Sequence, residues 1–230
     1  MKKSNGLIAV ILCTAIVLSG CSSLNRTAKG ALIGGGGGAA VGAGLGAIFG
    51  KSGKSAAIGA AIGGAVGATT GAIIGKKMDK AAAEAARIEG VRVDSIRDAN
   101  NLKAVKVSFD SGILFATGKS TLTSTSKTAL TKFAKILASN PTMDIAVMGH
   151  TDNTGSLEIN QKLSLNRAQS VVYFLKSQNI TSSQFKEISG KDWSLPVAEN
   201  NTAAGRKLNR RVEVYMYASE KMIEEAETGK

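Results

Sequence analysis

The sequence predicts an α+β fold: a sandwich domain of strands interleaved with helices at residues 88–218, preceded by a glycine-zipper helical hairpin at 30–76. Two observations carry this prediction. Apolar residues that alternate with period two are interleaved, across 88–218, with apolar residues at helical spacing. Across 30–76, glycine recurs every four residues. About 130 residues with such a pattern suffice for one hydrophobic core.

A targeting segment is predicted at residues 1–20. Lys2 and Lys3 precede an apolar run at 7–18 that is short for a membrane span and ends in small residues. The run Leu18-Ser19-Gly20-Cys21 resembles a bacterial lipobox, in which Cys21 is acylated and becomes the first residue of a lipidated tether at 21–29. An ordinary signal peptide is the alternative. With Cys13 removed and Cys21 acylated, the mature chain has no thiol for a disulfide or a metal.

The glycines of 30–76 form two runs separated by a polar turn, KSGKS. Those that recur every four residues lie at 30, 34, 38, 42, 46 and 50, and again at 59, 63, 67, 71 and 75. As helices, the runs would each be roughly 30 Å long with the glycines on one face. Eleven glycines cost a helix on the order of 10 kcal/mol, which only close helix packing offsets. A flexible linker is the alternative. A hairpin of this kind suits membrane insertion or self-association.

The GKS tripeptides in this turn do not form a phosphate-binding loop. A Walker A motif requires glycine where Leu45 and Ile48 stand.

The elements of the 88–218 domain follow from its periodicity. A helical linker is expected at 77–87, rich in Ala, Lys and Glu. Strands are expected around 91–93, 105–109, 143–148, 185–189 and 212–216, and helices at 123–139 and 160–177. Asn140-Pro141 ends the first of these helices. Residues 219–230 are expected to form a polar tail, either a solvated helix or a frayed end.

Charge limits the classes of partner. The formal net charge is +12, but eight of the 29 basic residues and none of the 17 acidic residues lie in 1–77, which leaves +4 for 78–230. Lysines that flank apolar segments suit anionic lipid head groups. Nucleic acid is not an expected partner, because the chain is exported and has few aromatic residues for stacking on bases.

Asp152 and Arg167 are the most informative charged residues. Asp152 is expected in the turn after a strand and Arg167 within a helix, and such a pair can bind a ligand that carries both an ammonium and a carboxylate. Each alone could be ordinary turn or surface chemistry. His150, the single histidine, cannot form a zinc site by itself, and no serine lies on a nucleophile elbow. We therefore expect no catalysis, metal or cofactor, and a structural role for His150.

Two motifs carry a resemblance to a known family. One reads GHTD-N-x-G and then N-x-x-LS-x-x-RA, from Gly149 to Ala168, and the other runs from Pro196 to the NRRVE sequence that ends at Glu213. Together they resemble the OmpA C-terminal-like peptidoglycan-binding domain, whose family includes the peptidoglycan-associated lipoprotein and MotB. The match covers 88–218. With the lipobox and glycine zipper, the chain is similar to YiaD-type lipoproteins of the OmpA family.

The resemblance implies a β-α-β-α-β sandwich domain that binds the peptidoglycan stem peptide non-covalently through its diaminopimelate. Asp152 would pair with the ligand ammonium and Arg167 with its carboxylate, for which a guanidinium fork is suited. The other pocket residues would be Thr154, Asn160 and Arg211, whereas Arg210 would be structural or touch the glycan.

One departure from the family pattern concerns the loop at 112–118, where Ala116 and Gly118 replace a common leucine and proline. The shape of this loop beside the pocket is therefore not set by the pattern.

The expected function is mechanical: a protein anchored by lipid at Cys21 in the outer membrane, whose periplasmic domain grips the wall. The alternative is a glycine-zipper membrane insertion or assembly factor that wall binding localises. Whether the zipper spans a membrane, lies flat on it or associates with other copies is left open by the sequence.

Overall fold

The computed structural model describes residues 67–98, 101–116 and 118–229. Within them lies a five-stranded sheet of order β1-β2-β5-β3-β4. The strands are β1 Val91–Arg97, β2 Lys103–Asp110, β3 Met143–Gly149, β4 Phe185–Gly190 and β5 Arg211–Ala218. Neighbours pair antiparallel except β3 and β4, which are parallel. The α+β prediction is confirmed, as are the five expected strands.

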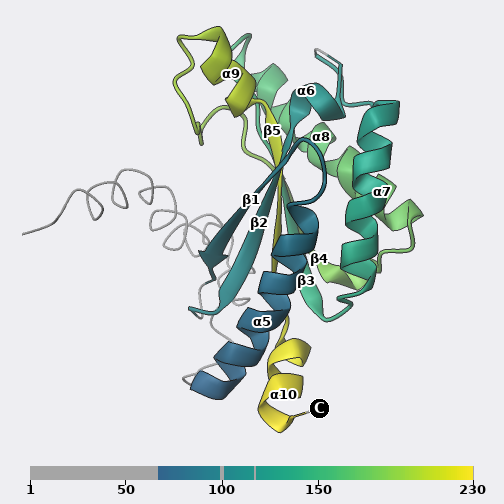
Figure 1. Ribbon diagram of the computed structural model, residues 1–230. Helices are drawn as coiled ribbons and strands as arrows, with labels where there is room; N and C mark the ends of the chain where they lie inside the picture. Colours follow the sequence, from purple (N-terminus) through teal and green to yellow (C-terminus); the bar gives the residue numbers. More distant parts are fainter. Residues whose placement is uncertain (1–66, 99–100, 117, 230) are drawn as a thin grey trace, which may run out of the picture. The chain divides into compact units, whose positions relative to one another are not determined.

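Several helices connect or flank the strands (Figure 1). They are α5 Ala68–Ala85, α6 Ser111–Leu114, α7 Ser124–Ala138, α8 Leu157–Ser177, η1 Ser182–Gln184, α9 Ala203–Asn209 and α10 Glu220–Thr228. Four of them begin at a hydroxyl that accepts a hydrogen bond from the first helical turn: Thr123 for α7, Ser156 for α8, Thr202 for α9 and Ser219 for α10. In Figure 1, α6 and α9 lie at one end of the sheet and α10 at the other.

The main core forms between one face of the sheet and α5, α7, α8 and α10. The alternation of β2 and β5 sends Val107, Phe109 and Val214 into this layer. Phe109 meets Phe133 of α7 edge to face, with ring centroids 5.4 Å apart. The opposite face of the sheet carries a smaller apolar cluster that includes Met148 and Tyr215. The two faces therefore have different roles, and the residues that follow β3 and precede β5 meet at one end of the sheet.

Two segments differ from the sequence-based expectation. The boundary expected at 76/77 lies inside α5, whose buried residues Ile74 and Met78 belong to the main core rather than to a linker. The expected polar tail forms α10, which buries Met222 and Ile223 in the same core. In both helices, a few apolar residues among charged or small ones pack against an element from the other end of the domain, since α5 and α10 contact each other.

The expected signal peptide, Cys21, the tether and most of the glycine zipper lie outside the described residues. Only the zipper's end, from Gly67, is described, and there the chain becomes α5. Among the described helices, none combines the length and hydropathy that crossing a bilayer requires.

Candidate ligand-binding site

The site begins where α8 approaches the ends of β3 and β4. At Gly149, a Cβ atom would lie 2.9 Å from the Ser164 carbonyl carbon, and at Gly190 it would overlap the backbone of α8. Ser164 is fully buried here, and its Oγ accepts a hydrogen bond from the Asp192 backbone N–H at 3.2 Å. Gly149 and Ser164 of the motif thus meet a packing requirement, which brings α8, the helix that carries Arg167, against the ends of β3 and β4.

Asp152 lies in that loop and is 7% exposed. Its Oδ1 accepts a hydrogen bond from the Thr154 backbone N–H at 2.9 Å, and its Oδ2 accepts one from Arg210 NH1 at 2.6 Å. Burial acts to raise the pKa of Asp152, but these hydrogen bonds outweigh it and hold the pKa below its ordinary value. Asp152 is therefore a fixed carboxylate near neutral pH.

Arg167 extends from α8 beside the loop that follows α6. It is 2% exposed, its Nε donates to the Lys119 carbonyl at 3.1 Å, and its guanidinium lies 5.3 Å from the Phe115 ring centroid. Burial, with repulsion from Arg210, lowers its pKa to about 10, while Asp152 opposes the shift. Arg167 NH1 has no hydrogen-bond partner in the described part of the chain. A buried cationic donor of this kind suits an anionic ligand.

The loop at 112–118, where the sequence departs from the family pattern, therefore lies beside the site. The Lys119 carbonyl orients the Arg167 side chain, and Gly118 adopts a left-handed backbone with φ of 68°. Glycine makes this conformation without strain, whereas proline, common at this position in the pattern, could not adopt it.

Thr154 and Asn160, both expected to line the pocket, hold the loop in shape. The Asn160 amide donates to the Thr154 carbonyl at 2.8 Å and to the Ser156 carbonyl at 3.1 Å, and the side chain is 3% exposed. Thr154 is exposed and fixes Asp152 through its backbone N–H. The structure thus gathers Asp152, Thr154 and Asn160 around the loop after β3, with Arg167 near enough for the charge of Asp152 to act on its pKa.

Arg210 and Arg211 differ from their expected roles. Arg211, expected in the pocket, is 3% exposed and donates to Glu213, to the Asn209 carbonyl and to the Leu195 carbonyl. Arg210, expected to be structural or to touch the glycan, is the residue that contacts Asp152. The alternation of side chains along a strand could have predicted this difference. Arg211 shares its sheet face with Glu213, two residues on, whereas Arg210 is one residue earlier and points to the other side.

His150 belongs to a buried network that links the two motifs. Its Nε2 lies 3.3 Å from Glu213 Oε2, which also accepts a hydrogen bond from Tyr215 at 2.6 Å. Burial lowers the pKa of His150, so that the ring is neutral at pH 7. Burial acts to raise the pKa of Glu213, but His150, Arg211 and Tyr215 together hold it well below its ordinary value. These contacts support the expected structural role of His150.

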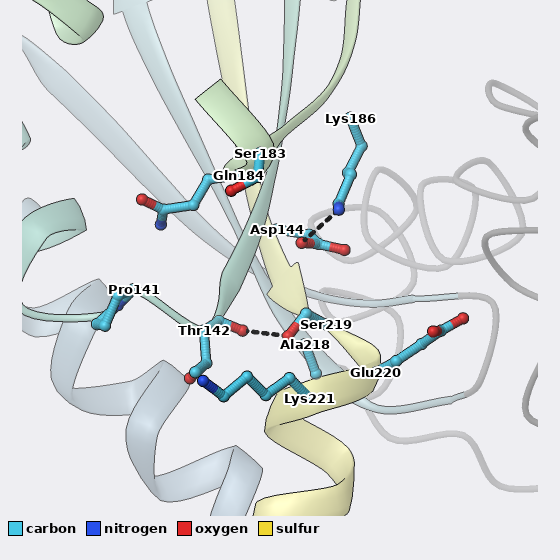
Figure 2. A pocket seen from close by; sticks show the side chains of 10 residues that line it. All are labelled: Pro141, Thr142, Asp144, Ser183, Gln184, Lys186, Ala218, Ser219, Glu220 and Lys221. Carbon is cyan, nitrogen blue, oxygen red and sulfur yellow. Dashed lines mark hydrogen bonds and ion pairs between the residues drawn. The ribbon is translucent and has the colours of Figure 1, made fainter. Parts of the chain in front are cut away.

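A separate pocket of about 410 Å³ lies at the opposite end of the sheet, beside the start of α10 (Figure 2). Asp144 and Lys186 form an ion pair at 3.5 Å on its wall, and Ser219 Oγ donates to the Thr142 carbonyl. None of the residues expected to bind ligand lines it. The motifs therefore point to the Asp152 end of the sheet and not to this pocket.

Comparison with known proteins identifies the family. The OmpA family matches residues 114–210, and the YMGG-like Gly-zipper matches residues 1–79. The probable lipoprotein YiaD of Escherichia coli K12 is 35% identical over 219 residues, which span 93% of this chain and 98% of that protein. The chain belongs to the OmpA family.

Further relatives agree with this OmpA-family assignment. The outer-membrane lipoprotein YfiB of Pseudomonas aeruginosa is 38% identical over 108 residues, or 47% of this chain and 64% of that protein. The cell wall anchor of the T6SS from Pseudomonas aeruginosa is 27% identical, with a TM-score of 0.52 over 62% of this chain and 97% of that chain. The resemblance predicted from the motifs is confirmed, and it points to a structural protein of the cell envelope rather than an enzyme.

Proposed function

We propose that this protein is a lipid-anchored envelope protein that binds peptidoglycan non-covalently through the diaminopimelate of the stem peptide. One observation carries the proposal: Asp152 is held as a carboxylate in the same site as Arg167, whose buried NH1 lacks a partner among the described residues. The free end of diaminopimelate bears an ammonium and a carboxylate on one carbon. Its ammonium would pair with the Asp152 carboxylate, and its carboxylate would pair with the Arg167 guanidinium.

The relatives support the setting of this proposal. The names of YiaD and YfiB describe lipoproteins, YfiB of the outer membrane, and the T6SS protein is a cell wall anchor. In the same arrangement here, lipid at Cys21 would hold one end in the outer membrane while the OmpA-family domain binds the wall in the periplasm. The function would be mechanical linkage of two envelope layers.

The test is calorimetric binding of a diaminopimelate-containing muropeptide to the mature chain. Asp152→Asn removes the charge but keeps the shape that accepts the Thr154 hydrogen bond, and Arg167→Met keeps apolar bulk beside Phe115. Each change should weaken binding by roughly 30-fold or more, since truncating a buried charged partner costs about 2–5 kcal/mol.

Matched controls are available on the same helix. Glu158→Gln and Lys162→Gln remove one charge of each sign at exposed positions of α8 and should leave affinity within about twofold. A muropeptide with lysine in place of diaminopimelate should bind more weakly, because it lacks the second carboxylate. Undiminished binding by Asp152→Asn and Arg167→Met would reject the site, and equal affinity for both muropeptides would reject the diaminopimelate assignment.

A second function, membrane insertion or assembly through the zipper, is favoured by the YMGG-like Gly-zipper match at 1–79. The discriminating deletion is 30–66, since a deletion to 76 would remove buried Ile74 of α5 and damage the domain itself. If the protein that lacks 30–66 still binds peptidoglycan but the cell envelope is defective, the zipper carries the function. If the deletion has no effect beyond release from the membrane, the anchoring function suffices.

A further inference from the structure

Arg210 occupies the oxygen of Asp152 that a ligand ammonium would use. Arg210 NH1 donates to Asp152 Oδ2 at 2.6 Å, while Oδ1 already accepts the Thr154 backbone N–H. The Asp152 side chain is only 10% exposed, so little of it is left for a second cation. Two cations on one small carboxylate would also repel each other. A ligand ammonium and Arg210 therefore compete for the same position.

Of the two partners, Arg210 is the one that can move. Its backbone is fixed, because its N–H donates to the Arg206 carbonyl at 3.1 Å and its carbonyl accepts from Ser111 N–H at 3.0 Å. Its side chain, however, is 37% exposed and can rotate about several bonds. When a ligand ammonium takes its place, the buried Asp152 carboxylate keeps a cationic partner, and the half-exposed Arg210 guanidinium is free to find another. The exchange therefore leaves no buried charge unpaired.

A displaced Arg210 would remain beside Arg167. The two guanidinium groups are close enough that Arg210 contributes to the lowered pKa of Arg167. Two neighbouring cations favour an anion that binds both, and guanidinium groups bind carboxylates through paired N–H donors. A ligand carboxylate bound by Arg167 would therefore also attract the guanidinium of Arg210 once that group has left Asp152.

We propose that Arg210 is a displaceable counter-ion of Asp152, which the ligand ammonium replaces and which then joins Arg167 on the ligand carboxylate. This inference rests on the proposed function and deepens it. It gives Arg210 the role of selecting ligands in which an ammonium and a carboxylate lie on the same carbon. An ammonium without a carboxylate displaces Arg210 and offers it no new partner.

The first test needs no ligand. Titration of the Asp152 carboxyl group by carbon NMR in the full mature chain should show a higher pKa in Arg210→Gln than in the wild type, because the hydrogen bond from Arg210 favours the carboxylate. Lys207→Gln, an exposed position on α9 that loses the same charge, should leave that titration unchanged. Equal titration in the wild type and Arg210→Gln would overturn the pairing on which the proposal stands.

The second test compares two muropeptides, one with diaminopimelate and one with lysine at the same position. Arg210→Gln should bind the diaminopimelate form about tenfold more weakly and the lysine form as well as or better than the wild type, so that the preference shrinks. Lys207→Gln should keep the wild-type preference. Thermal unfolding of each variant checks that the fold is retained.

The outcomes separate the two proposals. If Asp152→Asn abolishes binding but Arg210→Gln retains the wild-type preference, the proposed function stands and the role of Arg210 is overturned. If Arg210→Gln binds both muropeptides more tightly, Arg210 only competes for Asp152 and does not hold the carboxylate, which also overturns the proposal. If the wild type binds neither muropeptide, both proposals fail.

Discussion

Gly149→Ala tests whether the close approach of α8 to β3 controls both stability and the site. The added Cβ would lie 2.9 Å from the Ser164 carbonyl carbon and closer still to its oxygen, whereas ordinary contact begins at about 3.4 Å. Both obstacles are backbone atoms of a buried helix, so no side-chain rotation can relieve the overlap. The helix must retreat by roughly half an ångström at the carbon and by more at the oxygen.

This retreat has two expected consequences. Overpacking of this kind costs about 1–3 kcal/mol, which lowers the Tm by roughly 2–12 °C for a domain of this size. Arg167 lies one helical turn beyond Ser164 on α8, so it moves with the helix. Because paired N–H donors tolerate only about 0.5 Å of displacement, affinity for a diaminopimelate muropeptide should fall several-fold even where the protein is fully folded.

Urea unfolding and calorimetry at 25 °C measure the two effects. Gly67→Ala is the control, because Gly67 has an ordinary φ of −59° and no atom within 4 Å of an added Cβ. Its unfolding midpoint should stay close to that of the wild type. A Gly149→Ala protein with wild-type midpoint and wild-type affinity would refute the reasoning that this contact sets the position of Arg167.

Two further predictions concern the ends of the domain. Ile74→Ala should lower the free energy of unfolding by about 2–5 kcal/mol, because Ile74 is fully buried in the core through α5. The exposed Lys76→Ala should have little effect, and a loss no larger than that of Lys76→Ala would place α5 outside the core. Burial raises the pKa of Asp144 to about 6, against the opposing effect of Lys186. The folded state therefore binds this proton more tightly than the unfolded chain, and the stability it contributes below pH 4 is lost as the pH rises through 6. Relative to the wild type, Asp144→Asn should gain up to about 3 kcal/mol between pH 4 and pH 7 in urea titrations; a difference that does not vary with pH would contradict this.

The pattern of apolar residues was sufficient to predict the strands and the two long helices α7 and α8. Period two and period 3.6 report which side chains share a face, and that information is local. The helix limits also follow from local chemistry, since Thr123 caps α7 and Asn140-Pro141 follows its end. Motif spacing likewise predicted Asp152 and Arg167 as partners in one site.

The roles of α5 and α10 could not be predicted in this way. Alanine and glycine are compatible with a linker, a membrane helix or a buried helix, and only contact with the sheet distinguishes among these. Ile74 and Met78 became core residues because β2 and α10 lie against the same helix. A period identifies an apolar stripe, but the partner that covers the stripe comes from a distant part of the chain.

The sequence by itself determined the fold class and the family, and it predicted the acid–base pair of the proposed site. The tertiary structure decided which arginine meets Asp152, because Arg210 and Arg211 are adjacent in sequence and point to opposite sides of the chain. It also decided the surroundings of Arg167, whose contacts with Phe115 and the Lys119 carbonyl join residues about 50 positions apart. The sequence specifies which residues carry a charge. Contacts between distant segments determine the burial and pairing of each charged group, and these set its pKa.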